Sequence, residues 1–252
     1  MNKKPSIGSY TWTTLSNGKL SMKEKLSLIN QIMAPSMQQF MTTALRLDKS
    51  KRKLQFDDIA VPDTLFVKEA MGELEHYATP TLIAHSWRTY YWGAAFGLMR
   101  QQDFDPEMLL IGCLLHDLGL TADHASPECG CFTLASAKAA NTWSQKVGYP
   151  NEKAELVADM ICLHMNGHLE HNARIESRLL QQGASCDVIG AGYYQLYEDY
   201  RNKVLQQYPR QDFNRVFSQL LAQEAKQRPH SRTALLRQLG LPLMIRLNPF
   251  KQ

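Results

Sequence analysis

The chain has 252 residues, 44% of them hydrophobic and 21% charged, so it is long enough to bury a sizeable core as one large domain. Its net charge of +4 is scattered and lacks the clustered Lys and Arg of nucleic-acid binders, so we expect no nucleic-acid partner. No uninterrupted apolar run is long enough to span a bilayer, and five cysteines form no even disulfide framework. We therefore expect a cytoplasmic protein with no membrane partner. The composition leaves open whether it forms a homo-oligomer.

The first 60 residues have weak helical signals. Residues 1–20 hold turn residues without a hydrophobic period, which predicts an irregular lead-in. Ser21 and Glu24 form a capping-box pattern that predicts a helix over residues 22–33, while residues 34–60 are ambiguous. Because residues 1–60 are too poor in apolar side chains for a core of their own, we expect them to be an N-terminal extension packed on a main domain of residues 61–252.

The rest of the chain is a succession of helical patterns separated by proline, glycine and capping signals, which predicts an all-α fold. Gly183 is expected to end one helix, and Asp187 to lie at the start of a long helix through Tyr200. The predicted helices begin near Pro62 and at Pro80, Pro106 and Asn151, or extend over residues 132–147, 175–182, 213–226 and 231–238.

One apolar run ends in an adjacent imidazole and carboxylate, His116 and Asp117, followed by Gly119. The residues around the pair have the spacing of a buried helix face, so the carboxylate would enter the core at a cost of several kcal/mol unless it were paired or bound to a metal. A divalent cation would neutralise it and take the imidazole as a second ligand. The dipeptide by itself fits a helix cap equally well.

The helix that begins at Pro80 presents His85, Arg88 and Trp92 on one face, since they are three and seven residues apart. By itself His85 fits a core histidine, but beside a His-Asp pair we favour metal ligation. Arg88 fits pairing with a carboxylate, contact with an anionic or polar substrate group, or a surface salt bridge.

Three motifs follow one another along the chain: His85-Ser86-x-Arg88 with trailing aromatics, Leu115-His116-Asp117-Leu118-Gly119 and Asp187-Val188-Ile189-Gly190. The order His85, His116-Asp117, Asp187 resembles the HD-domain metalloenzyme superfamily. The three motifs resemble its cyanamide hydratase-like branch, and the resemblance covers roughly residues 75–250. It departs from that branch at Phe132-Thr133, where Phe-Glu would be expected.

The resemblance implies an HD-domain helical bundle whose metal ligands are His85, His116, Asp117 and Asp187. One divalent transition metal is expected; nitrogen and oxygen ligands admit zinc, iron, manganese, cobalt or nickel, and zinc is expected first. Asp117 and Arg88 are the expected catalytic residues. The expected substrate contacts are Arg88, His164, which falls where this branch has a histidine, and Asp123, in a loop over residues 120–130 above the metal.

The expected function is that of a hydrolase or hydratase acting on a small molecule through a metal-activated water, similar to cyanamide hydratases. One alternative is an HD phosphohydrolase or phosphodiesterase acting on a nucleotide or other phosphate ester, with His164 and His168 as additional ligands of a second metal. A glutamate expected in nucleotidase members is Leu120 here, and Arg88 is the one basic residue beside a motif. The second alternative is a catalytically inactive binding module.

Overall fold

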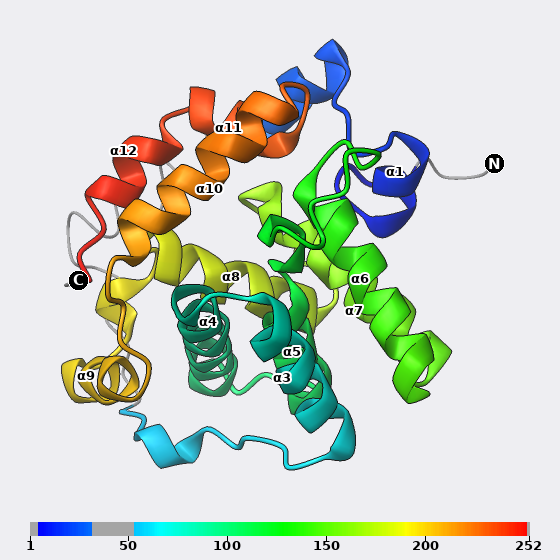
Figure 1. Ribbon diagram of the computed structural model, residues 1–252. Coiled ribbons are helices and arrows are strands. Elements are labelled where there is room, and N and C mark those ends of the chain that lie inside the picture. The colour runs from blue at the N-terminus through cyan, green and yellow to red at the C-terminus, as the bar shows by residue number, and fades with distance from the viewer. Residues whose placement is uncertain (1–4, 32–52, 251–252) are drawn as a thin grey trace.

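The computed structural model describes residues 5–31 and 53–250, and within these ranges it contains helices and no strand (Figure 1). The predicted all-α fold is confirmed. The ambiguous stretch predicted after residue 33 lies outside the described residues until residue 53. No described helix has both the length and the apolar character that a membrane crossing requires.

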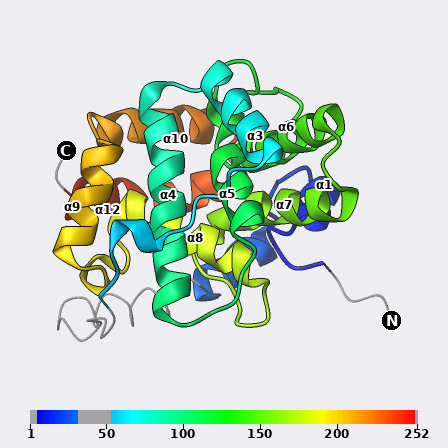
Figure 2. The same cartoon turned by 90° about the horizontal axis from the view of Figure 1, so that it is seen from below.

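Two helices, α4 (Pro80–Met99) and α8 (Ile175–Ile189), cross at the centre of the fold and make its most extensive helix contact (Figures 1 and 2). Their backbones touch at glycines: a Cβ on Gly93 would lie 2.6 Å from the Leu179 carbonyl oxygen, and one on Gly183 would lie 2.1 Å from that of Thr89. The contacts repeat every four residues along each helix. In order along the crossing, the pairs are Gly93 with Leu179, Thr89 with Gly183, and His85 with Asp187.

The prediction that Gly183 ends a helix is wrong. α8 continues through it and ends at Gly190, whose φ of 74° is left-handed. Gly183 is needed for the close approach of two helices, and the local sequence does not distinguish a packing glycine from a terminating one. Asp187 therefore lies in the last turn of α8. A 3-10 turn, η4 (Tyr193–Gln195), separates it from α9 (Glu198–Gln207), so the predicted long helix is wrong as well.

The helix that carries the His-Asp pair, α5 (Pro106–Leu115), is buried from Met108 to its end, as its apolar pattern predicts. It packs against α3 (Leu65–Tyr77), α4 and α7 (Asn151–Leu163). His116 is its C-cap, and Asp117 precedes a 3-10 turn, η2 (Leu118–Leu120). That turn packs against α6 (Phe132–Val147), where the Gly119 amide donates a hydrogen bond to Ser136 Oγ, 2.8 Å away.

Near the N-terminus, the chain packs against α6 and α7. The predicted irregular lead-in contains a short helix, α1 (Tyr10–Leu15), whose first turn is capped by the Ser9 hydroxyl. The Tyr10 amide donates to Asp159 of α7 at 2.7 Å. The capping box of the next helix is present, because the Ser21 amide donates to Glu24 at 3.0 Å and the Glu24 amide donates to the Ser21 hydroxyl at 3.3 Å. This helix spans residues 22–31 of the described chain. Residues Phe56–Asp58 form the 3-10 turn η1.

The C-terminal helices α10 (Phe213–Gln227), α11 (Arg232–Gln238) and α12 (Leu241–Arg246) gather at one side of α8, in orange to red in Figure 1. Phe213, Phe217 and Leu221 form a stripe along α10 with a four-residue spacing. This stripe belongs to a small core that contains Leu82, Phe132, Val188 and Ile245. α10 thereby covers the ends of α4 and α8 where the candidate site lies.

Candidate metal centre

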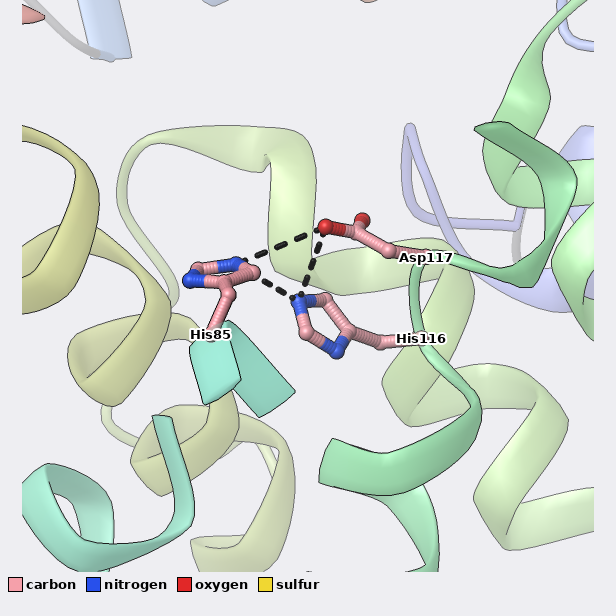
Figure 3. A group of neighbouring side chains, drawn as sticks. All are labelled: His85, His116 and Asp117. Carbon is pink, nitrogen blue, oxygen red and sulfur yellow. Dashed lines mark hydrogen bonds and ion pairs between the residues drawn. The ribbon is translucent and has the colours of Figure 1, made fainter. Parts of the chain in front are cut away.

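Three buried side chains from two segments converge on one point (Figure 3). His85 comes from α4, and His116 and Asp117 from the end of α5. The Nε2 atoms of the two histidines are 3.3 Å apart, and each lies 3.4 Å from Asp117 Oδ2. The residues are 0%, 1% and 3% exposed, so the group is removed from bulk water.

The hydrogen bonds of the two imidazoles assign their tautomers. His116 Nδ1 lies 2.7 Å from the Cys113 carbonyl oxygen, and His85 Nδ1 lies 2.7 Å from Asp187 Oδ2. Both Nδ1 atoms must therefore donate, which leaves a lone pair on each Nε2. Two lone pairs then face each other and a carboxylate. Neither oxygen of Asp117 has a hydrogen-bond partner among the described residues. A cation between the two Nε2 atoms and the carboxylate would therefore stabilise this arrangement.

The spacing of the three ligand atoms fits a divalent transition metal. A tetrahedral ion with bonds of about 2.0–2.1 Å to nitrogen and oxygen has ligand atoms about 3.3–3.4 Å apart. The observed edges of 3.3, 3.4 and 3.4 Å match this spacing. Three protein ligands and one open position are also typical of catalytic rather than structural zinc sites. The residues of the cluster therefore fit a bound metal ion.

The pKa values of the cluster follow from burial and mutual charge. Burial lowers the pKa of His85, but the nearby carboxylates of Asp117 and Asp187 outweigh it and raise the pKa above the ordinary value of 6.5. Burial lowers the pKa of His116, which Asp117 offsets only in part. Burial would raise the pKa of Asp117, but the surrounding histidines lower it below its ordinary value. Asp117 is therefore ionised at neutral pH.

Asp187, the predicted fourth ligand, is not brought to this point. It lies on the opposite side of the His85 ring, and its two oxygens accept hydrogen bonds from His85, Arg88, Trp92 and Arg210. Burial raises its pKa, but Arg88, Arg210 and His85 outweigh that effect and hold the pKa well below its usual range. With both oxygens engaged in these hydrogen bonds, Asp187 is placed to orient His85. The structure does not bring it together with the ligand atoms of His85, His116 and Asp117, and its direct ligation of the metal stays a prediction.

Arg88 is placed as a carboxylate partner, one of its three predicted roles. Its Nε and one terminal nitrogen donate to the two oxygens of Asp187 at 2.7 and 2.8 Å. The other terminal nitrogen donates to the carbonyl oxygens of Tyr208 and Pro209 at 3.3 and 3.0 Å. Every nitrogen of its guanidinium is thus engaged. Its predicted contact with substrate or reacting atoms stays a prediction.

His164, at the C-cap of α7, lies beside the other oxygen of Asp117. Its Nε2 is 3.8 Å from Asp117 Oδ1, and its ring packs edge-on against His116 with centroids 5.0 Å apart. Its Nδ1 donates to the Ile161 carbonyl oxygen at 2.6 Å. Burial and the neighbouring His116 lower the pKa of His164 to about 3, so the ring is neutral at neutral pH and Nε2 is an acceptor. His164 thus borders the three-ligand cluster without belonging to it.

The remaining sequence candidates lie away from the cluster. Asp123 is exposed in the predicted loop, and the structure does not place it with the ligand atoms. His124 of the same loop packs edge-on against Tyr77 of α3, with ring centroids 4.3 Å apart. His168 is exposed beyond the turn at Gly167 and is not part of the cluster, which weakens the expectation of a second metal.

Sequence reasoning missed the residues from the C-terminal part of the chain that contact the site. Phe213 of α10 stacks on His85 with ring centroids 4.7 Å apart, and Phe217 lies at 5.2 Å. Arg210, just before α10, donates to both the side chain and the carbonyl oxygen of Asp187. The apolar period of α10 could have identified its buried face, but no local signal connects Arg210 with a residue in another helix.

The fold and the cluster together define an all-α protein with a buried candidate metal centre. Residues 82–192 match the family model of the HD domain, which supports a place in the HD superfamily. Members of that family are typically metal-dependent hydrolases. The match spans His85, His116, Asp117 and Asp187 but none of α10 to α12. A search of curated proteins found no significant match to the chain.

Proposed function

We propose that this protein is a metal-dependent hydrolase or hydratase that binds one divalent transition metal ion and acts on a small neutral molecule. Zinc is the first candidate for the ion. The observation that carries the proposal is the triangle of ligand atoms from His85, His116 and Asp117, with edges that match a tetrahedral ion and tautomers fixed by hydrogen bonds on the far side of each ring. The HD domain at residues 82–192 supports it.

The surroundings of the cluster favour a neutral substrate over a phosphate ester. Phosphoryl transfer spreads negative charge over three equatorial oxygens and needs several cationic donors or a second metal. Arg88 and Arg210, which reach the carboxylate behind His85, both pair with Asp187. Aromatic side chains lie against the cluster, with Phe213 over His85 and Phe132 against His164. A small carbon electrophile such as a nitrile, cyanamide or amide suits these surroundings better.

The roles of the residues follow from their atoms. When bound, the divalent ion would polarise the electrophile and lower the pKa of water at the site. His85, His116 and Asp117 Oδ2 hold it, and Asp117 Oδ1 is left to accept a proton from the attacking water and return it to the product nitrogen. His164 Nε2, facing that oxygen, accepts a hydrogen bond and orients the water. Phe213 and Phe217 exclude bulk solvent.

A cytoplasmic location is part of the proposal. All five cysteines are unpaired and buried, which suits a reducing compartment. The partner we propose is the small-molecule substrate, and self-association into a homo-oligomer stays open.

Metal content of the purified protein provides the first test. Elemental analysis should find one divalent transition metal ion per chain. Two ions would favour the phosphodiesterase alternative, and the absence of a bound ion after incubation with zinc would favour a binding module.

Substrate class is the second test. A panel of small nitriles, cyanamide and amides should contain a better substrate for the zinc-loaded protein than any nucleoside monophosphate or cyclic dinucleotide. The resemblance to the cyanamide hydratase-like branch puts cyanamide first in the panel. Metal-dependent release of phosphate from nucleotides, without turnover of the neutral compounds, would reverse the ranking.

A further inference from the structure

The carboxylate of Asp187 accepts hydrogen bonds from four different side chains. His85 and Arg88 reach it from α4 at 2.7–2.8 Å, Trp92 at 3.1 Å, and Arg210 from the segment before α10 at 2.9 Å. The carbonyl oxygen of Asp187 also accepts two bonds, from Arg210 at 3.0 Å and from the Asn248 side chain at 2.8 Å. Arg210 and Asn248 thus hold this residue from outside the matched HD domain.

The segment Asn248–Phe250 is itself fixed around the end of α8. The Phe250 amide donates to Asn248 Oδ1 at 2.9 Å, and the Phe250 ring stacks on Trp92 with centroids 5.2 Å apart. Pro249 lies so close to Gly190 that a Cβ there would meet it at 2.2 Å. The Arg210 guanidinium lies over the Phe250 ring, 5.4 Å from its centroid. Arg210 and the segment Asn248–Phe250 therefore contact each other, and together they form the support of Asp187.

The metal-facing atom of His85 depends on this support. Nε2 offers a lone pair only while Nδ1 carries the proton, and Nδ1 carries the proton because Asp187 Oδ2 accepts it at 2.7 Å. A carboxylate that shifted or rotated would release both the tautomer and the orientation of the ring. Arg210 fixes the side chain and the backbone of Asp187 with one nitrogen atom, which is 2.9 Å from the carboxylate and 3.0 Å from the carbonyl oxygen.

We propose that Arg210 and Asn248 are positioning residues that fix the tautomer and orientation of His85 through Asp187 and thereby set the affinity of the site for its metal ion. The part that concerns metal affinity rests on the proposed function. The part that concerns the His85 tautomer does not, because it is a property of the metal-free protein.

The test uses the full chain and four variants. Arg210→Gln and Asn248→Ala remove the two supports separately, and Arg210→Lys restores a cation. Arg215→Gln is the matched control, since Arg215 lies on α10 and its ion pair with Asp212 is exposed. If Arg210→Gln does not fold, Asn248→Ala provides the test. It removes the donor to the Asp187 carbonyl oxygen and the acceptor of the Phe250 amide, and it leaves all charges in place.

In the metal-free protein, long-range proton–nitrogen NMR spectra of the histidine rings should show His85 protonated at Nδ1 in the wild type and in Arg215→Gln. Arg210→Gln and Asn248→Ala should shift or broaden these signals, and Arg210→Lys should restore them in part. Unchanged His85 signals in both variants would overturn the inference, whatever happens to their melting temperatures.

Zinc affinity, measured by competition with a chromophoric chelator, and the visible spectrum of the cobalt-loaded protein provide the second readout. Arg210→Gln and Asn248→Ala should weaken zinc binding by about 10- to 100-fold and alter the cobalt bands, as loss of an outer hydrogen bond does at metal sites. Wild-type affinity and spectra in variants that only melt earlier would reduce both residues to a structural role. A wild type with the expected His85 tautomer but no metal binding would refute the proposed function and leave the positioning of His85 standing.

Discussion

Replacing Asp117 by asparagine should separate the metal site from the fold. The substitution keeps the shape of the side chain and removes its charge. Asp117 is 3% exposed, and its Oδ2 lies 3.4 Å from both histidine Nε2 atoms, whereas neither oxygen has a hydrogen-bond partner in the part of the chain that the structure describes. The carboxylate therefore contributes to metal binding and little to the hydrogen bonding of the metal-free fold.

The expected loss of metal affinity can be estimated. Zinc binding of about 10–16 kcal/mol at four-ligand sites corresponds to about 2.5–4 kcal/mol for each ligand. Since about 1.4 kcal/mol is a factor of ten, Asp117→Asn should weaken zinc binding roughly 10²- to 10³-fold. The metal-free variant should match the wild type in stability to within about 1–3 kcal/mol, because the desolvation cost of the buried carboxylate opposes the attraction of the histidines that lowers its pKa. The comparison belongs at about pH 8, where ordinary imidazoles are neutral.

The assay is zinc competition with a chromophoric chelator, together with thermal unfolding of the metal-free protein. Asp123→Asn is the matched control, because Asp123 is an exposed aspartate in the neighbouring loop. It should bind zinc as the wild type does, and any change in KM would revive its predicted contact with substrate. Zinc affinity of Asp117→Asn within about tenfold of the wild type would refute the assignment of the carboxylate as a ligand.

Three further predictions follow from the same geometry. His164→Ala should lower turnover more than zinc affinity, since His164 contacts Asp117 Oδ1 and not the ligand triangle; loss of one metal ion while a second stays bound would make it a ligand. Zinc affinity should fall as the pH falls through the raised pKa of His85, because a proton competes with the metal for Nε2. In the metal-free protein, the raised pKa of His85 contributes stability that is fully present below the pKa of an unfolded histidine. This contribution is lost as the pH rises through the pKa of His85 in the folded state. An affinity independent of pH between about 6 and 9 would contradict this assignment. Gly119→Ala should lower the free energy of unfolding by at least about 1–3 kcal/mol, because the new Cβ would lie 2.1 Å from the Phe132 carbonyl oxygen. Gly72→Ala on α3 is the control: its Cβ would meet no described atom within 4 Å, and it should raise the free energy of unfolding by about 0.5–1 kcal/mol. Urea unfolding measures both variants.

Local patterns predicted most of the elements that carry the site. The spacing of His85, Arg88 and Trp92 placed them on one face of α4, and all three contact Asp187. The predicted bounds 132–147 agree with α6, because its stop signal at Gly148 is local: the residue adopts a left-handed φ of 70°. These predictions succeeded because the decisive physical constraint lies within a few residues in sequence.

The failures involve residues whose role is set by a distant partner. Gly183 fits a helix end as well as a close crossing, and only the backbone of Thr89 decides between them. The place of Asp187 depends on Arg210, which no local pattern connects with it. Similarly, the short helix α1 is stabilised by the contact between Tyr10 and Asp159, far along the chain. Which side of an imidazole a carboxylate occupies is therefore a tertiary property.

The backbone contact between α4 and α8 also limits which amino-acid substitutions the chain can accept in evolution. The glycine contacts at Gly93 and Gly183 act as a spacer that holds the two helices at a fixed separation, and His85 and Asp187 lie at the next position along the same row. A bulkier residue at either glycine would push the helices apart and lengthen the bond between imidazole and carboxylate without touching either group. A smaller side chain on the facing helix could not compensate, because the atoms that each new Cβ would meet first belong to the backbone. The precision of the site is thus inherited from two residues that have no side chains.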